Sequence, residues 1–266
     1  MSPVAAASAA LEPPIRATAE RGGEIERIVL DRPKANVLDI EMLGAIRNRV
    51  RALSASPGNL KLLVFEGAGA HFSFGASVPE HLPENVGTLV PLFHRLFRDL
   101  DELGAPTAAI VRGQCLGGAL ELASWCGMVF ASPEAKLGVP EASLGVFPPV
   151  ANLTIPWRTG GARAARLAVT GEILDAGRSL AWGLVDDVSD DPDAALAGWF
   201  EKHLSPKSAV AIRYAWRAAR RPLTLALRND LPDLEKLYLD DLMTRRDPVE
   251  GLTAFLEKRP PVWRHE

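Results

Sequence analysis

Strand-like and helix-like segments alternate along the first half of this chain of 266 residues. Short apolar runs that stop at proline or glycine predict strands at 23–33, 60–67 and 105–113. The segments that follow these runs space their apolar residues as helices do, at 38–55, 86–104 and 119–132, and the last of them passes from helix into strand. Strands joined through helices form right-handed crossovers, so we expect an α/β fold with a mainly parallel sheet.

The second half of the chain has a different pattern, because its helix-like segments are separated by few strand-like ones. After Pro149 these helix-like segments are 162–171, 175–185, 193–204, 208–221 and 231–259. We therefore predict an α/β core followed by a helical C-terminal region. The expected boundaries are a flexible N-terminal tail over residues 1–20, the core over 21–200 and the C-terminal region over 201–266.

The composition is that of an ordinary globular protein, with 47% hydrophobic and 24% charged residues. The formal net charge of −3 argues against a nucleic-acid-binding protein, because such proteins usually carry a strong basic excess. Arg-rich stretches at 47–51 and 213–221 fall within helix-like segments. A solvated helix face is a simpler interpretation of these stretches than an RNA-binding surface.

The cysteines and the N-terminal residues bear on the cellular compartment. Cys115 and Cys126 are too few for a disulfide framework and lack metal-site spacing, which favours a reducing compartment. Residues 1–14 lack the basic start of a signal or transit peptide, and no apolar run reaches the roughly 18 residues of a membrane span. The five histidines show no metal-ligand spacing, and only His81 follows a loop of interest. We expect a cytoplasmic protein without a metal, membrane or nucleic-acid partner.

Two glycine-containing turns leave the main chain unusually bare. The stretch "HFSFGASVPEH" at 71–81 places aromatic residues on both sides of a Gly-Ala-Ser break, although loops are normally solvated. The second turn, Gly117-Gly118, lies where a strand passes into a helix, so its amide N–H groups have no helical partner. Such a turn can accept an anion or a polarised oxygen, although close helix–strand packing explains it equally well. Neither phosphate-binding loop pattern is present.

Two glutamates lie near these turns. Glu121 follows Gly118 by three positions, and its side chain therefore leans back toward the start of the helix. Its apolar neighbours suggest a half-buried acid with a raised pKa, while the plain alternative is a first-turn glutamate favoured by the helix dipole. Glu141 follows an apolar strand end in a loop rich in glycine and proline, where open α/β sheets place their chemistry. Two carboxylates beside two bare turns suit acid–base chemistry at a carbonyl group.

Several motifs together resemble one family. The motifs, in chain order, are "DRPKANVLDIEML", "HFSFGASVPEH", "IVRGQCLGGALELASWC", "AKLGVPEASLGVFP", "LAVTGEILDAGRSLAWGLVDDV" and "GLTAFLEKR". Their order and spacing resemble the enoyl-CoA hydratase/isomerase superfamily, the crotonases, from about Gly23 to Arg259. The resemblance implies a spiral core of ββα turns over 21–200 and a C-terminal helical trimerisation region over 201–266. It also implies assembly as a homotrimer or as a hexamer made of two trimers.

The resemblance further implies a coenzyme A thioester as substrate. The thioester oxygen would lie in an oxyanion hole formed by the backbone N–H groups of Ala76 and Gly118, and Glu121 and Glu141 would hold one water between them. Coenzyme A is part of the substrate, so no metal or separate cofactor is implied. The resemblance implies further substrate-binding residues at Lys34, Ala35, Val37, Phe74, Ser77, Val78, Gly117, Phe147, Phe255 and Lys258.

Three departures from the family pattern affect the expected substrate and mechanism. The first loop reads Gly75-Ala76-Ser77 instead of Gly-Ala-Asp, and Phe74 replaces a small residue and enlarges an apolar wall. The sequence Phe147-Pro148-Pro149-Val150 replaces a Gly-rich helix start, which puts the usual helix-dipole assistance in doubt. The stretch "FSFGASVPEHLP" resembles hydratases of anaerobic benzoyl-CoA degradation that act on cyclohexa-1,5-diene-1-carbonyl-CoA.

We therefore predict a hydro-lyase that adds water to a conjugated cyclic dienoyl-CoA. One alternative is a general 2-enoyl-CoA hydratase of fatty or aromatic acid breakdown, and another is an enoyl-CoA isomerase. A non-enzymatic alternative is a crotonase-like binding or scaffold protein. The sequence leaves open whether addition is 1,2 or 1,4, in which direction the reaction runs, and which glutamate is the acid.

Overall fold

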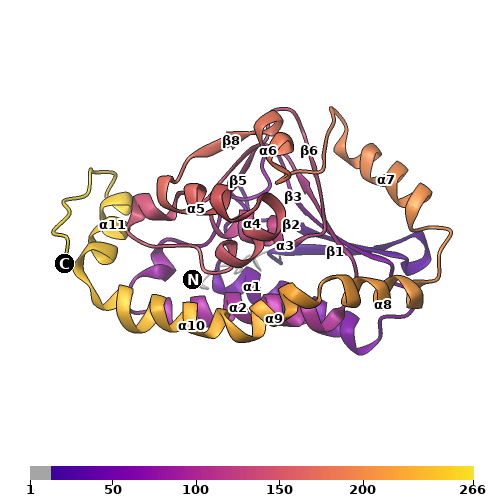
Figure 1. Ribbon diagram of the computed structural model, residues 1–266, viewed down its shortest axis with the longest axis horizontal. Helices are drawn as coiled ribbons and strands as arrows, with labels where there is room; N and C mark the ends of the chain where they lie inside the picture. The colour runs from indigo at the N-terminus through magenta and orange to yellow at the C-terminus, as the bar shows by residue number, and fades with distance from the viewer. Residues whose placement is uncertain (1–12) are drawn as a thin grey trace, which may run out of the picture.

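The computed structural model describes residues 13–266, and within them the main sheet has six strands (Figure 1). Their order is β1-β2-β3-β4-β6-β9, and only the pairing of β1 with β2 is antiparallel. The strand bounds are β1 Ile15–Glu20, β2 Ile25–Leu30, β3 Leu62–Gly67, β4 Thr107–Val111, β6 Met128–Ala131 and β9 Asp187–Val188. The predicted mainly parallel sheet is therefore confirmed.

A second, smaller sheet lies beside the first in the described part of the chain. It consists of β5 (Gln114–Leu116), β7 (Lys136–Gly138) and β8 (Ile173–Asp175), in that order. Isolated bridges between Ser73 and Cys115 and between Leu38 and Ala76 continue this second row of pairing. Successive passes of the chain therefore contribute to both rows before a helix returns the chain to the main sheet. This second row carries the turns that form the site.

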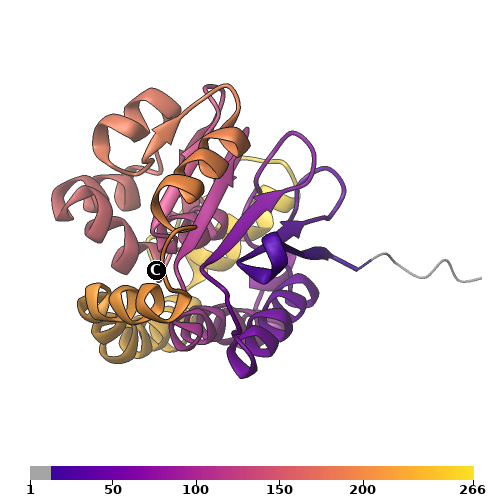
Figure 2. The same ribbon diagram turned by 90° about the vertical axis from the view of Figure 1, so that its right-hand side faces the viewer.

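Helices cover the sheets and extend along one side of the molecule. In Figures 1 and 2, α1 and α2 lie beside the C-terminal helices α8 to α10, beneath the main sheet. The helix bounds are α1 Ile40–Ala55, α2 Val86–Leu103, α3 Gly118–Trp125, α4 Ala151–Thr159, α5 Gly161–Thr170, α6 Ala176–Trp182, α7 Pro192–His203, α8 Ala209–Ala219, α9 Arg221–Asn229, α10 Leu231–Lys236 and α11 Arg246–Leu256. A π-helical turn (Leu237–Asp241) and a 3-10 turn (Leu242–Thr244) connect α10 to α11. The predicted helical C-terminal region is confirmed.

Local sequence signals explain where the helices nearest the site begin and end. Asp39 precedes α1, and its side chain accepts a hydrogen bond from the Met42 amide at 2.8 Å, which caps the helix. Gly104 ends α2 in the left-handed conformation, with φ of 59°. The buried face of α2 is largely apolar and packs Phe97 edge-on against Trp125 of α3, with ring centroids 5.7 Å apart. This packing holds α3, which begins at Gly118, against the core.

One boundary prediction is wrong in part. Residues 15–20 were expected to belong to a flexible tail, but they form β1 and pair antiparallel with β2. This edge strand keeps most of its side chains exposed, so its sequence lacks the apolar alternation that predicts a strand. Residues 1–12 of the predicted tail lie outside the described residues. Within residues 13–266, no helix combines the length and the apolar character needed to cross a bilayer.

Candidate active site

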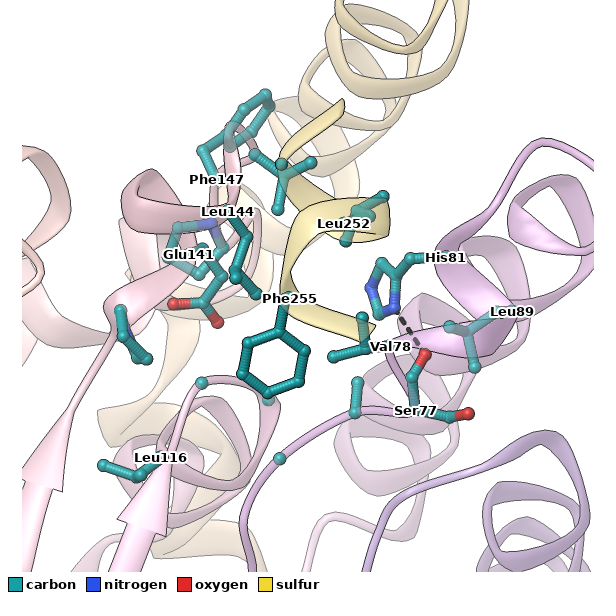
Figure 3. Close-up of a pocket in the computed structure, with 18 of the residues that line it drawn as sticks. Ser77, Val78, His81, Leu89, Leu116, Glu141, Leu144, Phe147, Leu252 and Phe255 are labelled. Atoms are coloured by element: carbon teal, nitrogen blue, oxygen red, sulfur yellow. Dashed lines mark hydrogen bonds between the residues drawn. The ribbon is translucent and has the colours of Figure 1, made fainter. Parts of the chain in front are cut away.

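A cavity of about 730 Å³ opens where the second row of pairing meets α2 and the C-terminal region. Figure 3 shows its walls, with Glu141 and Phe147 on one side, Ser77 and His81 on the other, and Leu252 and Phe255 of α11 between them. The predicted site residues that line it are Val37, Phe74, Ala76, Ser77, Val78, Gly117, Gly118, Glu121, Glu141, Phe147 and Phe255. The structure therefore brings together most of the residues that the sequence singled out.

The amide groups of Ala76 and Gly118 are close neighbours in the cavity wall. The bridge to Leu38 uses the amide of Ser77 and the carbonyl of Gly75, which leaves the Ala76 N–H outside the pairing. Gly118 is the first residue of α3, so its N–H has no helical partner. Neither amide donates to a protein acceptor within the described part of the chain. A methyl group placed on Gly118 would lie 3.3 Å from the Ala76 nitrogen, which shows how closely the two turns approach.

Gly75 makes this close approach possible. Its φ is +98°, and a methyl group on it would lie 2.5 Å from the Leu116 carbonyl oxygen in β5. The hydroxyl of Ser73 supports the turn, since it donates to the Asn36 carbonyl at 2.7 Å and accepts from the Gly75 amide at 3.0 Å. The main chain of the turn therefore rests directly on β5, which explains why the loop carries so little side-chain bulk at this point.

Glu121 lies on α3, a helix whose residues are all buried, and 4% of the Glu121 surface is exposed. Its carboxylate accepts a hydrogen bond from the Ala151 amide at 2.9 Å, and Ala151 is the first residue of α4. Burial raises the pKa of Glu121, and the amide hydrogen bonds from the start of α4 offset part of this increase. The sequence at 147–150 puts in doubt whether a helix dipole assists the site. In the structure, the N-terminus of α4 points at Glu121, one of the two acids.

Glu141 lies on a 3-10 turn (Pro140–Leu144) across the cavity wall from Gly117. A methyl group on Gly117, which has φ of +55°, would lie 2.8 Å from Glu141 Oε1. The other carboxylate oxygen, Oε2, is buried without a hydrogen-bond partner in the described part of the chain. Burial raises the pKa of Glu141, and the nearby charge of Glu121 raises it further. The two acids therefore behave as one coupled pair that retains a proton more readily than isolated carboxyl groups do.

The rest of the cavity wall is mostly apolar and aromatic. Phe74 is 44% exposed and packs edge-on against His71, with ring centroids 5.0 Å apart. Phe147 packs edge-on against Tyr238 at 5.3 Å. Phe72, the first phenylalanine of the 71–81 stretch, is instead fully buried in the core.

Three predicted residues do not line the cavity. Lys34 and Ala35 lie in the loop after β2, where the Ala35 carbonyl accepts a hydrogen bond from the Phe74 amide at 3.0 Å. Lys258 follows α11 in the left-handed conformation, with φ of 56°. Their roles in holding the nucleotide end of a substrate stay predictions.

Other residues that line the cavity were not predicted as site residues, and His81, His94 and Tyr238 are among them. His81 donates from Nδ1 to the Ser77 carbonyl at 2.8 Å, and burial lowers its pKa. His94 donates from Nδ1 to Glu235 Oε2 at 2.6 Å, which ties α2 to α10. Only His81 has a local sequence signal, because it follows the first glycine turn. Within residues 13–266, no three His, Cys, Asp or Glu side chains gather as a metal site, and the absence of a metal requirement stays a prediction.

The comparison with protein families bears directly on this geometry. The family model described as enoyl-CoA hydratase/isomerase matches residues 20–266. The chain belongs to this family. A cyclohexa-1,5-dienecarbonyl-CoA hydratase of Thauera aromatica is 41% identical over 250 residues, which cover 94% of this chain and 96% of the relative. The mitochondrial methylglutaconyl-CoA hydratase of Rattus norvegicus is 30% identical over 240 residues, covering 87% of this chain and 76% of the relative.

The fold agrees with this assignment. The crystal structure of an enoyl-CoA hydratase from Mycobacterium avium subsp. paratuberculosis K-10 superposes with a TM-score of 0.82 at 27% identity, covering 94% of this chain and 98% of that one. The predicted crotonase-like fold with a C-terminal helical region is therefore confirmed, as is the enzyme class. The protein is a lyase of the enoyl-CoA hydratase type. An acyl-CoA substrate is consistent with this family, whereas a non-catalytic scaffold is not supported.

Proposed function

We propose that this enoyl-CoA hydratase adds water to a conjugated cyclic dienoyl-CoA thioester, cyclohexa-1,5-diene-1-carbonyl-CoA. The observation that carries the proposal is the pairing of two buried, charge-coupled glutamates with two unpartnered amides around one cavity. Two lines of support favour a ring over a linear chain. The relative from Thauera aromatica has this activity in its name, and Phe74 and Phe147 give the cavity aromatic walls.

The proposed reaction begins when the amides of Ala76 and Gly118 donate to the thioester oxygen. The polarised thioester withdraws electrons from the conjugated double bond, and a water lies between Glu121 and Glu141. One carboxylate accepts a proton from this water as its oxygen attacks the β-carbon of the double bond that is conjugated to the thioester. Negative charge moves onto the thioester oxygen, where the two amides stabilise the enolate. The other glutamate, which is protonated at the start of the reaction, delivers its proton to the α or terminal conjugated carbon.

The balance of this reaction needs no separate cofactor. One O–H bond of water and one C=C π bond break, one C–O and one C–H bond form, and no electrons are gained or lost overall. The thioester supplies the activation that a metal or redox group would otherwise provide. We further propose that the nucleotide arm passes near Lys34, Ala35 and Lys258, and that the enzyme acts in the cytoplasm as a trimer or hexamer in breakdown of aromatic compounds.

A comparison of two substrates tests the acyl group. We expect kcat/KM for cyclohexa-1,5-diene-1-carbonyl-CoA to exceed that for linear crotonyl-CoA by about 10–200-fold, the range in which an apolar pocket discriminates by shape. Product mass spectrometry should show the gain of one water. Preference for crotonyl-CoA would favour a general 2-enoyl-CoA hydratase. A rearranged product with unchanged mass would instead identify an isomerase.

The coupled acids predict a shifted pH dependence. Hydration needs one ionised carboxylate as base and one protonated carboxyl as acid, so activity requires a single proton on the pair. Because the pKa values of Glu121 and Glu141 are both raised, this state is populated at higher pH than in a pair of ordinary carboxyl groups. We expect kcat/KM to fall as pH rises through the higher apparent pKa and to fall again in acid. A pH profile that is flat from pH 5 upward would contradict the coupled pair.

A further inference from the structure

The hydroxyl group of Tyr238 has no hydrogen-bond partner in the described part of the chain, and the residue is almost completely buried, with only 1% of its surface exposed. An unpaired buried hydroxyl is costly, and buried polar groups nearly always find a partner. Tyr238 lies in the π-helical turn Leu237–Asp241, a backbone irregularity that often occurs at functional sites. A group of this kind indicates that a bound molecule supplies the missing partner.

The surroundings of Tyr238 show where that partner would lie. The residue lines the same cavity as the two glutamates. Its ring packs in an apolar cluster formed by Val86, Val90, Val146 and Leu252. Its hydroxyl is therefore a polar group in an otherwise apolar part of the cavity wall. Burial and then the charges of Glu141 and Glu121 raise its pKa, which keeps the phenol protonated as a donor. Tyr238 and both acids therefore border the same cavity.

The two acids do not satisfy every hydrogen bond that a water bound between them can make. One oxygen of Glu121 is already bonded to the Ala151 amide, whereas Glu141 Oε2 is a buried acceptor without a partner. A water that donates its hydrogens to carboxylates has two lone pairs on its oxygen. One lone pair attacks the substrate, and the other can accept a hydrogen bond. The ionised carboxylate has no hydrogen to donate, and the protonated carboxyl group directs its hydrogen to the substrate carbon.

We propose that Tyr238 is a further catalytic residue, whose hydroxyl donates a hydrogen bond to the oxygen that is added to the acyl group. It contacts this oxygen as water before the addition and as the new hydroxyl group afterwards. The inference rests on the proposed hydration and assigns a third polar group to the same site. Tyr238 comes from the C-terminal region, so that region contributes to the chemistry as well as to the cavity wall.

Tyr238→Phe removes this hydroxyl and preserves the ring that packs against Phe147. The chain has two tyrosines, and Tyr214→Phe is the matched control, because Tyr214 lies on α8 and is 67% exposed. We would measure the affinity of each variant for two CoA esters, the hydroxylated hydration product and cyclohexanecarbonyl-CoA. The second ester has the ring but lacks the hydroxyl. Thermal unfolding of both variants checks that the fold is intact.

We expect Tyr238→Phe to bind the hydroxylated ester roughly threefold to tenfold more weakly, the range for one neutral hydrogen bond, and to bind cyclohexanecarbonyl-CoA unchanged. Its kcat should fall while KM for the dienoyl-CoA changes little, and Tyr214→Phe should match the unmodified enzyme. Equal weakening for both esters, or no change for either, would overturn the proposal. Failure of the proposed function looks different, because the unmodified enzyme would then fail to hydrate the dienoyl-CoA at all.

Discussion

Glu141→Gln is expected to lower kcat by roughly 10²–10⁴-fold, the usual contribution of a general acid or base. Glutamine has nearly the same shape as glutamate but can neither accept nor deliver the proton. Glu121→Gln should have an effect of the same order, because the mechanism needs one acid and one base at the same time. Steady-state kinetics give kcat, and binding of cyclohexanecarbonyl-CoA, which cannot be hydrated, reports whether the pocket remains intact. That affinity should change little.

Glu84→Gln provides the control for both substitutions. Glu84 lies on the exposed segment before α2 and does not line the cavity, so the change removes a carboxylate without touching the site. This variant should keep the activity of the unmodified enzyme. If either active-site glutamine variant retained most of its turnover, the two-glutamate mechanism would be wrong, whatever the acyl group proves to be.

Gly75→Ala is expected to lower kcat by about 10²–10³-fold, the usual effect of losing one oxyanion-hole donor. The added methyl group would lie 2.5 Å from the Leu116 carbonyl oxygen and 3.3 Å from the Gly118 nitrogen. The φ of +98° also disfavours any residue with a side chain. The turn must therefore move away from β5, which separates the Ala76 amide from the Gly118 amide. Both glutamates stay in place, so the loss would be confined to stabilisation of the enolate.

Gly87→Ala is the matched control for this change. Gly87 lies in the first turn of α2, where a methyl group meets no other atom within 4 Å. It should leave kcat unchanged and slightly stabilise the helix, because alanine has the higher helix propensity. Circular dichroism and thermal unfolding would separate a local defect of the turn from general unfolding. A folded Gly75→Ala enzyme with normal kcat would show that the spacing of the two amides is not critical.

The residues that could be predicted from sequence carry their signals locally. Gly118 and Glu121 share one helix face three positions apart, and Glu141 follows a strand end, so each could be located without knowledge of the fold. The edge strand β1 could not, because its exposed side chains carry no apolar pattern. The hydrogen bond from Ala151 to Glu121 also could not be predicted, since it joins residues 30 positions apart through the placement of α4.

The position of Tyr238 in the site also could not be predicted from the sequence. Its sequence neighbourhood reads as an ordinary amphipathic helix, and nothing in the spacing marks it as part of a site. Only the packing of the C-terminal region against α2 brings it into the cavity, more than 90 positions from Glu141 in sequence. Helical periodicity predicts that such a residue is buried, but it does not predict what the residue faces.

The groups that would stabilise the enolate belong to the main chain at residues 76 and 118, and the path of the backbone positions them. Most side-chain changes during evolution would leave such donors in place as long as the two turns keep their conformation. The acids and the aromatic walls, by contrast, can diverge one residue at a time. A scaffold of this design can therefore pass thioester activation on to descendants while their acyl-group preferences drift apart.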